Sequence, residues 1–273
     1  MPASESPKLD VELLLAHVLQ KTRTYLHTWP EKILTPAQWD EFQALVKRRR
    51  QGEPIAFLLG YQDFWNLRLR VSPCTLIPRP DTERLVEVAL EKAAAKDHSS
   101  GKILDLGTGT GAIALALAKE LPCWRVTGTD QSPAAIILAG ENASLNQVSN
   151  TSFLISDWFD QLVAESFDLI VSNPPYIDPL DPHLKQGDVR FEPSSALIAG
   201  NKGLADIERI VEEAPHWLAA GGWLLLEHGY DQASSVRALL TARGFVQAES
   251  WQDYGGNDRV SGGCWCSMQG EVS

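Results

Sequence analysis

Apolar residues recur at helical spacing over the first fifty residues of the chain. Within this region, Thr35–Gln38 has the sequence of a helix start: the threonine caps, a proline occupies the first turn and the glutamine completes a capping box. The four basic residues Lys47–Arg50 suit the negative end of the helix dipole, and Gly52 then stops the helix. We therefore expect residues 1–54 to form a small, all-helical domain.

The pattern changes over residues 55–78, where three short apolar or alternating runs are separated by Gly60 and Pro73. These runs are Ile55–Leu59, Phe64–Leu69 and Val71–Ile77. Runs of this length with glycine or proline between them are typical of strands joined by tight turns. The sequence therefore predicts a β-hairpin linker that leads into a second domain.

From residue 79 onward, helix and strand patterns alternate. Asp81 is placed to cap a helix from Thr82 to about Lys96. The later runs expected as strands are Ile103–Leu106, Trp124–Thr129, Thr151–Ile155, Phe167–Ser172, Trp223–Leu226, Phe245–Trp251 and Arg259–Trp265. Helices are expected over Ala112–Leu121, Pro133–Asn146 and Ile207–Leu218. This alternation favours an α/β domain over residues 79–273, with a mostly parallel sheet between helices.

A glycine-rich segment joins the first of these strands to its helix, and its residues are Asp105, Leu106, Gly107, Thr108, Gly109, Thr110 and Gly111. Glycine lets the backbone turn tightly and approach a ligand closely. Asp130 ends the next strand, where a carboxylate could accept hydrogen bonds from both ribose hydroxyls of an adenosine. The pattern therefore predicts a nucleoside cofactor. A dinucleotide stays open, because Gly109, Gly111 and Ala114 also fit a dinucleotide-binding fingerprint.

Two features favour S-adenosylmethionine as the cofactor. Asp105 lies two positions before the first glycine, where its carboxylate could meet the cationic amino-acid end of that molecule. The helix that follows also carries little that could receive a pyrophosphate. A glycine-rich turn without any ligand is the remaining alternative, and the matching Asp130 disfavours it.

The segment Asn173, Pro174, Pro175 and Tyr176 follows the strand expected at Phe167–Ser172. Strands of a parallel sheet present ligands at their carboxyl ends, so this segment should face the same crevice as the glycine-rich segment. The prolines fix the backbone and remove two N–H donors, which leaves the Asn173 side-chain oxygen and the Pro174 carbonyl as acceptors for an NH2 group. Tyr176 offers a flat face to a planar amide or base. The motif therefore predicts methylation of an amide or amine nitrogen, although a rigid proline turn would have the same sequence.

The net charge of the chain limits the class of substrate. The chain has 24 basic and 35 acidic residues, a net charge of −11. Residues 1–80 carry 11 basic and 8 acidic side chains, whereas residues 81–273 carry 13 and 27. A nucleic-acid enzyme normally has a basic surface where it meets phosphate, so the acidic larger part disfavours a DNA substrate. No leader or membrane-spanning run is apparent, and we expect a soluble cytoplasmic protein.

Other candidate residues are weaker. Trp158 could flank an adenine ring or could belong to the core. Glu227-His228 ends a predicted strand, as a site pair or as a satisfied polar pair. Neither the histidines nor the four cysteines have the spacing of metal ligands, so no metal is expected. The basic run Lys47–Arg50 suits a solvated helix end but could also contact an anionic partner.

Nearly the whole chain resembles one family, the PrmC/HemK glutamine-N5 methyltransferases that modify peptide chain release factors. Besides the glycine-rich segment and Asn173–Tyr176, the stretches that carry the likeness are Arg49–Pro54, Gly60, Ile77–Glu83, Val189–Pro193, Leu226–Gly229 and Asp253–Val260. Asn-Pro-Pro-Tyr alone is shared with DNA adenine methyltransferases, but its combination with Ile77–Glu83 and Asp253–Val260 is much more specific.

The resemblance implies a Rossmann-like, seven-stranded methyltransferase domain with its last strand antiparallel, preceded by a helical substrate-recognition domain and a hairpin linker. It implies transfer from S-adenosylmethionine to N5 of the glutamine in the Gly-Gly-Gln motif of class 1 peptide chain release factors. By the family pattern, Gly107–Gly111, Asp130 and Trp158 line the cofactor site, with Asp105 and Asn173 beside them. Asn173, Pro174 and Tyr176 are the expected catalytic residues, and Asn173–Tyr176 hold the substrate amide.

Four alternatives stay open at this point. A ribosomal-protein glutamine methyltransferase would carry the same motifs. An adenine-N6 methyltransferase of DNA or RNA is disfavoured by the charge of residues 81–273. An oxidoreductase would use the glycine-rich segment but would leave Asn173–Tyr176 unexplained, and a non-catalytic scaffold would have no need of either motif.

Overall fold

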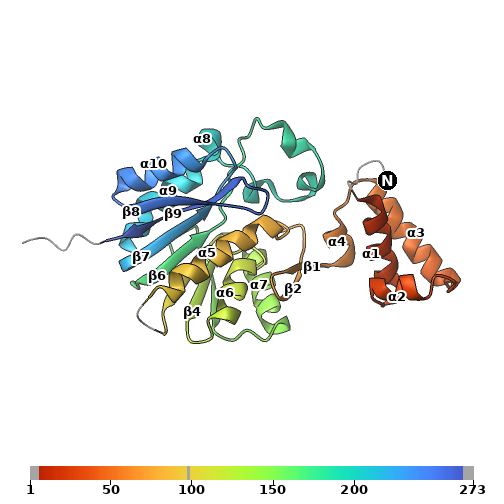
Figure 1. The fold of residues 1–273 in the computed structure, drawn as a ribbon. Helices are drawn as coiled ribbons and strands as arrows, with labels where there is room; N and C mark the ends of the chain where they lie inside the picture. Colours follow the sequence, from red (N-terminus) through yellow and green to blue (C-terminus); the bar gives the residue numbers. More distant parts are fainter. Residues whose placement is uncertain (1–5, 97–98, 267–273) are drawn as a thin grey trace, which may run out of the picture.

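A computed structural model describes residues 6–96 and 99–266 of the 273-residue chain. Figure 1 shows a helical N-terminal region joined through a narrow linker to a larger α/β domain. In the described ranges, no helix is long and apolar enough to cross a membrane. The fold class expected from the sequence is confirmed.

The N-terminal region consists of the helices α1 (Pro7–Leu19), α2 (Arg23–Thr28), α3 (Pro36–Arg50) and α4 (Ile55–Leu59). The predicted capping box at the start of α3 is present: the Thr35 hydroxyl accepts from Gln38 N at 3.3 Å, and the Gln38 side-chain oxygen accepts from Thr35 N at 3.0 Å. A small apolar core formed by Leu14, Val18, Leu45 and Leu58 joins α1, α3 and α4.

The strand expectation for Ile55–Leu59 is wrong, because these residues form α4. An apolar run of five residues does not reveal its periodicity, and Pro54 and Gly60 at its ends suit a helix as well as a strand. Gly60 ends α4 in a left-handed conformation with φ of +78°. The hairpin follows as β1 (Tyr61–Phe64) and β2 (Leu67–Arg70), which pair antiparallel. Val71–Ile77 is not a strand. The division of the chain at residues 54 and 78 stays a prediction.

The larger domain opens with a single 3-10 turn, Pro80–Thr82, and α5 (Glu83–Ala94). Asp81 lies within this turn and does not cap the helix, contrary to expectation. The remaining helices are α6 (Ala112–Glu120), α7 (Pro133–Leu145), α8 (Gly200–Gly203), α9 (Ala205–Glu213) and α10 (Ala233–Arg243). Helix α9 ends five residues before the predicted Leu218, because Pro215 follows and Leu218 already starts a strand.

Seven strands form one sheet in the order β5-β4-β3-β6-β7-β9-β8. They are β3 (Lys102–Leu106), β4 (Arg125–Asp130), β5 (Thr151–Ile155), β6 (Phe167–Ser172), β7 (Leu218–Glu227), β8 (Val246–Gln252) and β9 (Asp258–Trp265). The first five are parallel, and β9 pairs antiparallel with both β7 and β8. The carboxyl ends of β3, β4, β6 and β7 therefore meet at one edge of the sheet.

Alternate side chains of the buried strands point to two apolar layers. Ile103 of β3 packs with α5, α6 and the hairpin, whereas Leu104 and Leu106 pack with α9 and α10 on the opposite face. Both layers are visible in Figure 1, where α5, α6 and α7 cover one face of the sheet and α9 and α10 cover the other. The two layers hold the strand ends rigidly in place.

One buried arginine connects the N-terminal region to the α/β domain through an ion pair with a partly exposed aspartate. Arg49 at the end of α3 donates to Asp10 of α1 at 2.7 Å and to Asp188 at 3.0 Å. Asp188 lies 139 residues after Arg49, in the loop that follows Asn173–Tyr176. The sequence suggested a solvated basic run at Lys47–Arg50, but only 8% of the Arg49 side chain is exposed.

Replacing Arg49 by alanine should destabilise the protein by about 3–5 kcal/mol, because the carboxylate of Asp10 would stay buried without its partner. Equilibrium unfolding in urea measures this loss. The neighbouring Arg50 is exposed, so Arg50→Ala is the matched control and should change the free energy of unfolding by less than about 0.5 kcal/mol. Equal effects of the two substitutions would contradict the assignment.

Candidate functional site

The glycine-rich segment folds as a tight loop between β3 and α6. Gly107, Gly109 and Gly111 have φ angles of +70°, +54° and +83°, which side chains other than glycine rarely adopt. Thr108 N donates to Thr129 O at 2.8 Å, and Gly109 N donates to the Asp130 carboxylate at 2.9 Å. The loop is thus fastened to the end of β4, and its backbone forms one side of a cavity.

Asp130, at the end of β4, accepts a backbone hydrogen bond on each oxygen. Gly109 N donates to Oδ2 and Ser132 N to Oδ1, both at 2.9 Å. Burial raises the pKa of this carboxyl above its ordinary value. Each carboxylate oxygen has two acceptor sites, so Asp130 can still accept hydrogen bonds from a ligand.

Asp105 lies behind the glycine loop and is not part of the cavity lining. Its Oδ2 accepts from the Thr108 hydroxyl at 2.6 Å and from Ala114 N at 3.2 Å. Its Oδ1 is buried and has no hydrogen-bond partner among the described residues. Burial raises the pKa of Asp105 to about 7. The carboxylate therefore supports the loop from below.

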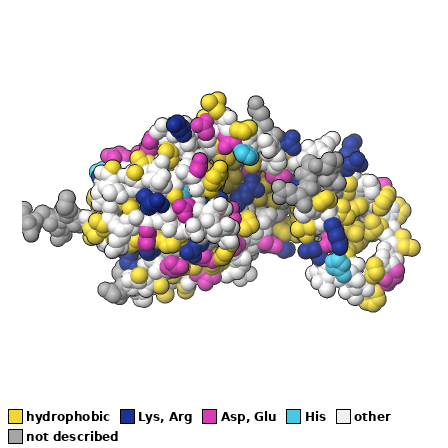
Figure 2. All heavy atoms as spheres, turned by 45° about the horizontal axis from the view of Figure 1, so that its top comes forward, with side chains coloured by type: hydrophobic (Ala, Val, Ile, Leu, Met, Phe, Trp, Pro, Cys, Tyr) yellow, Lys and Arg dark blue, Asp and Glu magenta, His cyan; other side chains and the backbone are white. Residues whose placement is uncertain are grey.

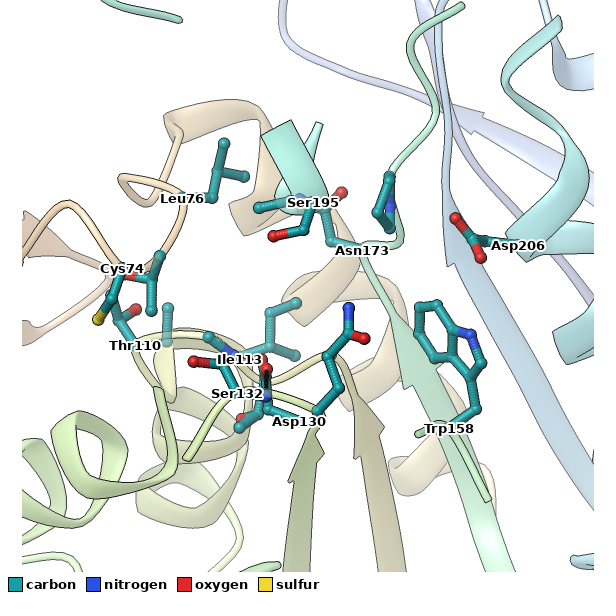
Figure 3. A pocket seen from close by; sticks show the side chains of 18 of the residues that line it. Cys74, Leu76, Thr110, Ile113, Asp130, Ser132, Trp158, Asn173, Ser195 and Asp206 are labelled. Atoms are coloured by element: carbon teal, nitrogen blue, oxygen red, sulfur yellow. Dashed lines mark hydrogen bonds between the residues drawn. The ribbon is translucent and has the colours of Figure 1, made fainter. Parts of the chain in front are cut away.

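Trp158 lines the cavity beside the glycine-rich loop. Its backbone has a φ of +50°, which is a strained conformation for a bulky residue. The hydroxyl of Ser156 donates to the Trp158 carbonyl at 3.0 Å. The indole of Trp158 lies against Gly107, where an added Cβ would come within 3.5 Å of the ring. Figure 3 shows the indole facing Asp206, and the indole N–H donates a hydrogen bond to the Asp206 carboxylate. These contacts hold the ring along the cavity wall.

Asn173 and Pro175 line the cavity at the end of β6, whereas Pro174 and Tyr176 do not. The Asn173 side-chain nitrogen donates to the Thr82 hydroxyl at 3.2 Å. With its NH2 group engaged by Thr82, the amide oxygen of Asn173 is the atom left for the cavity, and Figure 3 shows this side chain between Ser195 and Trp158.

Tyr176 is held from two sides. Its hydroxyl donates to Glu227 Oε1 at 3.3 Å, and burial raises its pKa well above the ordinary value. Its carbonyl accepts from the Gln232 side chain at 3.1 Å. Gly203 passes so close that a Cβ there would lie 2.0 Å from the same carbonyl oxygen, which makes glycine necessary. The Tyr176 ring packs against the apolar layer that α9 and α10 form with the sheet.

The cavity has a volume of about 530 Å³. The structure brings most of the predicted site residues together around it: Gly107, Thr108, Gly109, Thr110, Asp130, Trp158, Asn173 and Pro175. Gly111 instead fits α6 against α7, because a Cβ there would lie 3.2 Å from Ala139. Among residues 6–96 and 99–266, no cluster of three or more His, Cys, Asp or Glu could hold a metal ion.

Sequence reasoning missed part of the lining. Residues 74–76 of the linker, Thr82, Ser195 and Asp206 all face the cavity. Thr82 lies in the Ile77–Glu83 stretch that had been noted for its resemblance, so a signal existed, but its partner Asn173 is 91 residues away. His228, by contrast, bonds through Nε2 to Ser261 at 2.7 Å within the core and has no place in the site.

Comparison with known proteins agrees with this geometry. Residues 2–60 match the PrmC N-terminal domain and residues 82–189 match the methyltransferase small domain. The chain superposes on a 16S rRNA methyltransferase from Thermus thermophilus, solved with AdoMet and guanosine, with a TM-score of 0.54 and 19% identity, covering 75% of this chain and 49% of that one. The fold and the site thus define a Rossmann-like methyltransferase.

Similar proteins of known name identify the family within this class of methyltransferases. The chain is 57% identical to a release factor glutamine methyltransferase from Vibrio cholerae, over 94% of this chain and 90% of that protein. It is 51% identical to one from Escherichia coli K12, over 96% and 93%. The chain therefore belongs to the release factor glutamine methyltransferase family.

The raised pKa of Asp105 makes its effect on stability depend on pH. Between pH 4 and 7 the folded state holds a proton that the unfolded chain releases, so the Asp105 contribution to the free energy of unfolding falls as pH rises. Asp105→Asn removes this contribution. The free energy of unfolding of the wild type, relative to that of the variant, should therefore fall by on the order of 2 kcal/mol between pH 5 and pH 8.

Urea unfolding at the two pH values measures this difference. The control is Asp40→Asn, which makes the same substitution on the exposed side of α3. A pH-independent difference for Asp105→Asn would show that Asp105 is ionised throughout.

Proposed function

We propose that this protein transfers a methyl group from S-adenosylmethionine to the side-chain amide nitrogen, N5, of the glutamine in the Gly-Gly-Gln motif of class 1 peptide chain release factors. The observation that carries the proposal is the fixed amide of Asn173: its nitrogen is bound to Thr82, so its oxygen is presented to the cavity as an acceptor. The names of the relatives supply the identity of the substrate.

The cavity fits the cofactor. When bound, S-adenosylmethionine supplies an electrophilic methyl group on a sulfonium. Asp130 would accept from the ribose hydroxyls, and Trp158 would flank the adenine. The side-chain-free backbone at Gly107 and Gly109 allows close approach along the loop. Above its pKa of about 7, the Asp105 carboxylate behind the loop would add negative potential for the cationic amino-acid end.

Asn173 and Pro174 would hold the substrate amide. The oxygen of the Asn173 side chain and the carbonyl of Pro174, which joins the two lining residues Asn173 and Pro175, would accept its two N–H groups. These two acceptors keep electron density on the nitrogen and orient it toward the methyl donor. The proton leaves the nitrogen after transfer, so a strong base is not required beforehand. Pro175 completes the wall, and Tyr176 is held outside the lining by Glu227 and Gln232. Positioning and exclusion of water then supply most of the rate.

The N-terminal region is suited to grip the release factor. It exposes large apolar side chains, which Figure 2 shows as yellow areas on the helical region at the right. These side chains are Leu9, Val11, Trp29, Ile33 and Trp39. Exposed apolar groups of this kind gather at protein–protein contact sites. With a release factor as its partner and no DNA substrate, the enzyme would act in the cytoplasm, where translation ends.

The decisive assay offers labelled S-adenosylmethionine and the enzyme four acceptors: a class 1 release factor, its Gln→Ala variant in the Gly-Gly-Gln motif, a ribosomal protein and duplex DNA. Label is expected on the unaltered release factor alone. Equal label on the Gln→Ala variant would refute the assigned site of methylation. Label on the ribosomal protein or on DNA in place of the release factor would refute the assigned substrate.

Asn173→Ala should reduce methyl transfer by about 100-fold or more, because the amide acceptor for the substrate is lost. Cofactor affinity, measured by calorimetry, should stay within about threefold, because Asp130 and Trp158 are untouched. Asn66→Ala, at an exposed position in the β1–β2 hairpin, is the matched control. A near-normal rate of the Asn173 variant would remove this residue from its proposed role.

A further inference from the structure

The hydroxyl of Thr82 is buried between two polar side chains, those of Asn173 and Glu227, at the carboxyl ends of the strands. Only 4% of the residue is exposed. Its Oγ1 accepts the side-chain N–H of Asn173 at 3.2 Å, and its hydroxyl lies close enough to the Glu227 carboxylate to oppose the rise in the pKa of that group. A hydroxyl has one proton to donate. Because the Asn173 nitrogen occupies an acceptor site of Thr82, that proton is free to point to Glu227.

Glu227 is the last residue of β7 and is 1% exposed. Its Oε1 accepts from the Tyr176 hydroxyl, and its Oε2 has no hydrogen-bond partner within the described residues. The charged groups that face it are Arg259 of β9 and Asp81 of the turn before α5. Arg259 is in turn paired with Asp253 at 3.1 Å and lies 3.7 Å from Asp81.

We propose that Thr82 and Glu227 are positioning residues for the methyl acceptor. Ionised Glu227 accepts the protons of Thr82 and Tyr176, and Thr82 then accepts the N–H of Asn173, so that the Asn173 oxygen faces the cavity. This inference rests on the proposed function, because it concerns how the substrate amide is held.

The direction of the chain of hydrogen bonds follows from the chemistry of its last member. The two orientations of an asparagine amide have nearly the same shape, so packing alone does not select one. An ionised carboxylate only accepts hydrogen bonds, and this fixes the Thr82 hydroxyl as a donor to it. The remaining lone pairs of Thr82 then accept N–H and disfavour the Asn173 oxygen. A flipped amide would present N–H donors to the N–H donors of a substrate glutamine.

The arrangement makes activity depend on pH. Burial raises the pKa of Glu227 to about 7, with Asp81 adding to the rise and Thr82, Arg259 and Tyr176 opposing it. Below that pH, protonated Glu227 can itself donate to Thr82, and the orientation of Asn173 is no longer enforced. We expect kcat to rise with pH through about 7.

The first test compares Thr82→Val with Thr82→Ser. Valine keeps the shape and removes the hydroxyl, whereas serine keeps it. With a release factor as substrate, kcat of the valine variant should fall by roughly tenfold, and the serine variant should stay within about threefold of wild type. The dissociation constant for S-adenosylmethionine should change little in either. Equal rates of the two variants would overturn the role of Thr82.

The second test is the pH profile of Glu227→Gln. The amide keeps the size of the carboxyl but both donates and accepts, so kcat should be lower and its rise near pH 7 should disappear. A profile that keeps this rise would overturn the role of Glu227. Failure of the proposed function is distinguishable, because wild-type enzyme would then leave the release factor unlabelled, whereas failure of this inference leaves wild-type activity intact.

Discussion

Three carboxyl groups at the carboxyl edge of the sheet determine how the surrounding loops fold. Asp105, Asp130 and Glu227 lie at the ends of β3, β4 and β7. A carboxylate removed from water is costly unless hydrogen-bond donors replace the solvent. The neighbouring loops supply those donors as Thr108 beside Asp105, Gly109 beside Asp130 and Tyr176 beside Glu227. The loops that shape the cavity are thus folded against these buried carboxyl groups.

The remaining stretches of family likeness converge on the same edge. Glu192 accepts from Ile77 N at 3.0 Å and pairs with Arg79 at 2.6 Å, so the Val189–Pro193 and Ile77–Glu83 stretches are joined directly. Arg259, from Asp253–Val260, faces Asp81 and Glu227. Segments that look unrelated along the sequence therefore form a single support for Asn173.

The sequence was sufficient for the parts of the molecule that are determined locally. Alternation of strand and helix patterns predicted the sheet, and the spacing of glycines before Asp130 predicted the loop and its place at the strand ends. Residue-level contacts over long separations could not be predicted in this way. Nothing near Thr82 indicates that it bonds to Asn173, and nothing in the basic run at Arg49 indicates an ion-pair partner 139 residues away. The run Ile55–Leu59 was misassigned because five apolar residues carry no readable period.

The linker has a consequence for how this enzyme can be divided. Cys74, Thr75, Leu76 and Pro78 form part of the cavity wall, although they precede the α/β domain in the chain. A fragment cut at residue 79 would keep the whole sheet and the glycine loop, yet its cavity would open to water on that side. Recombination between members of such a family would therefore have to move the linker together with the sheet, and the helical region alone is the exchangeable module.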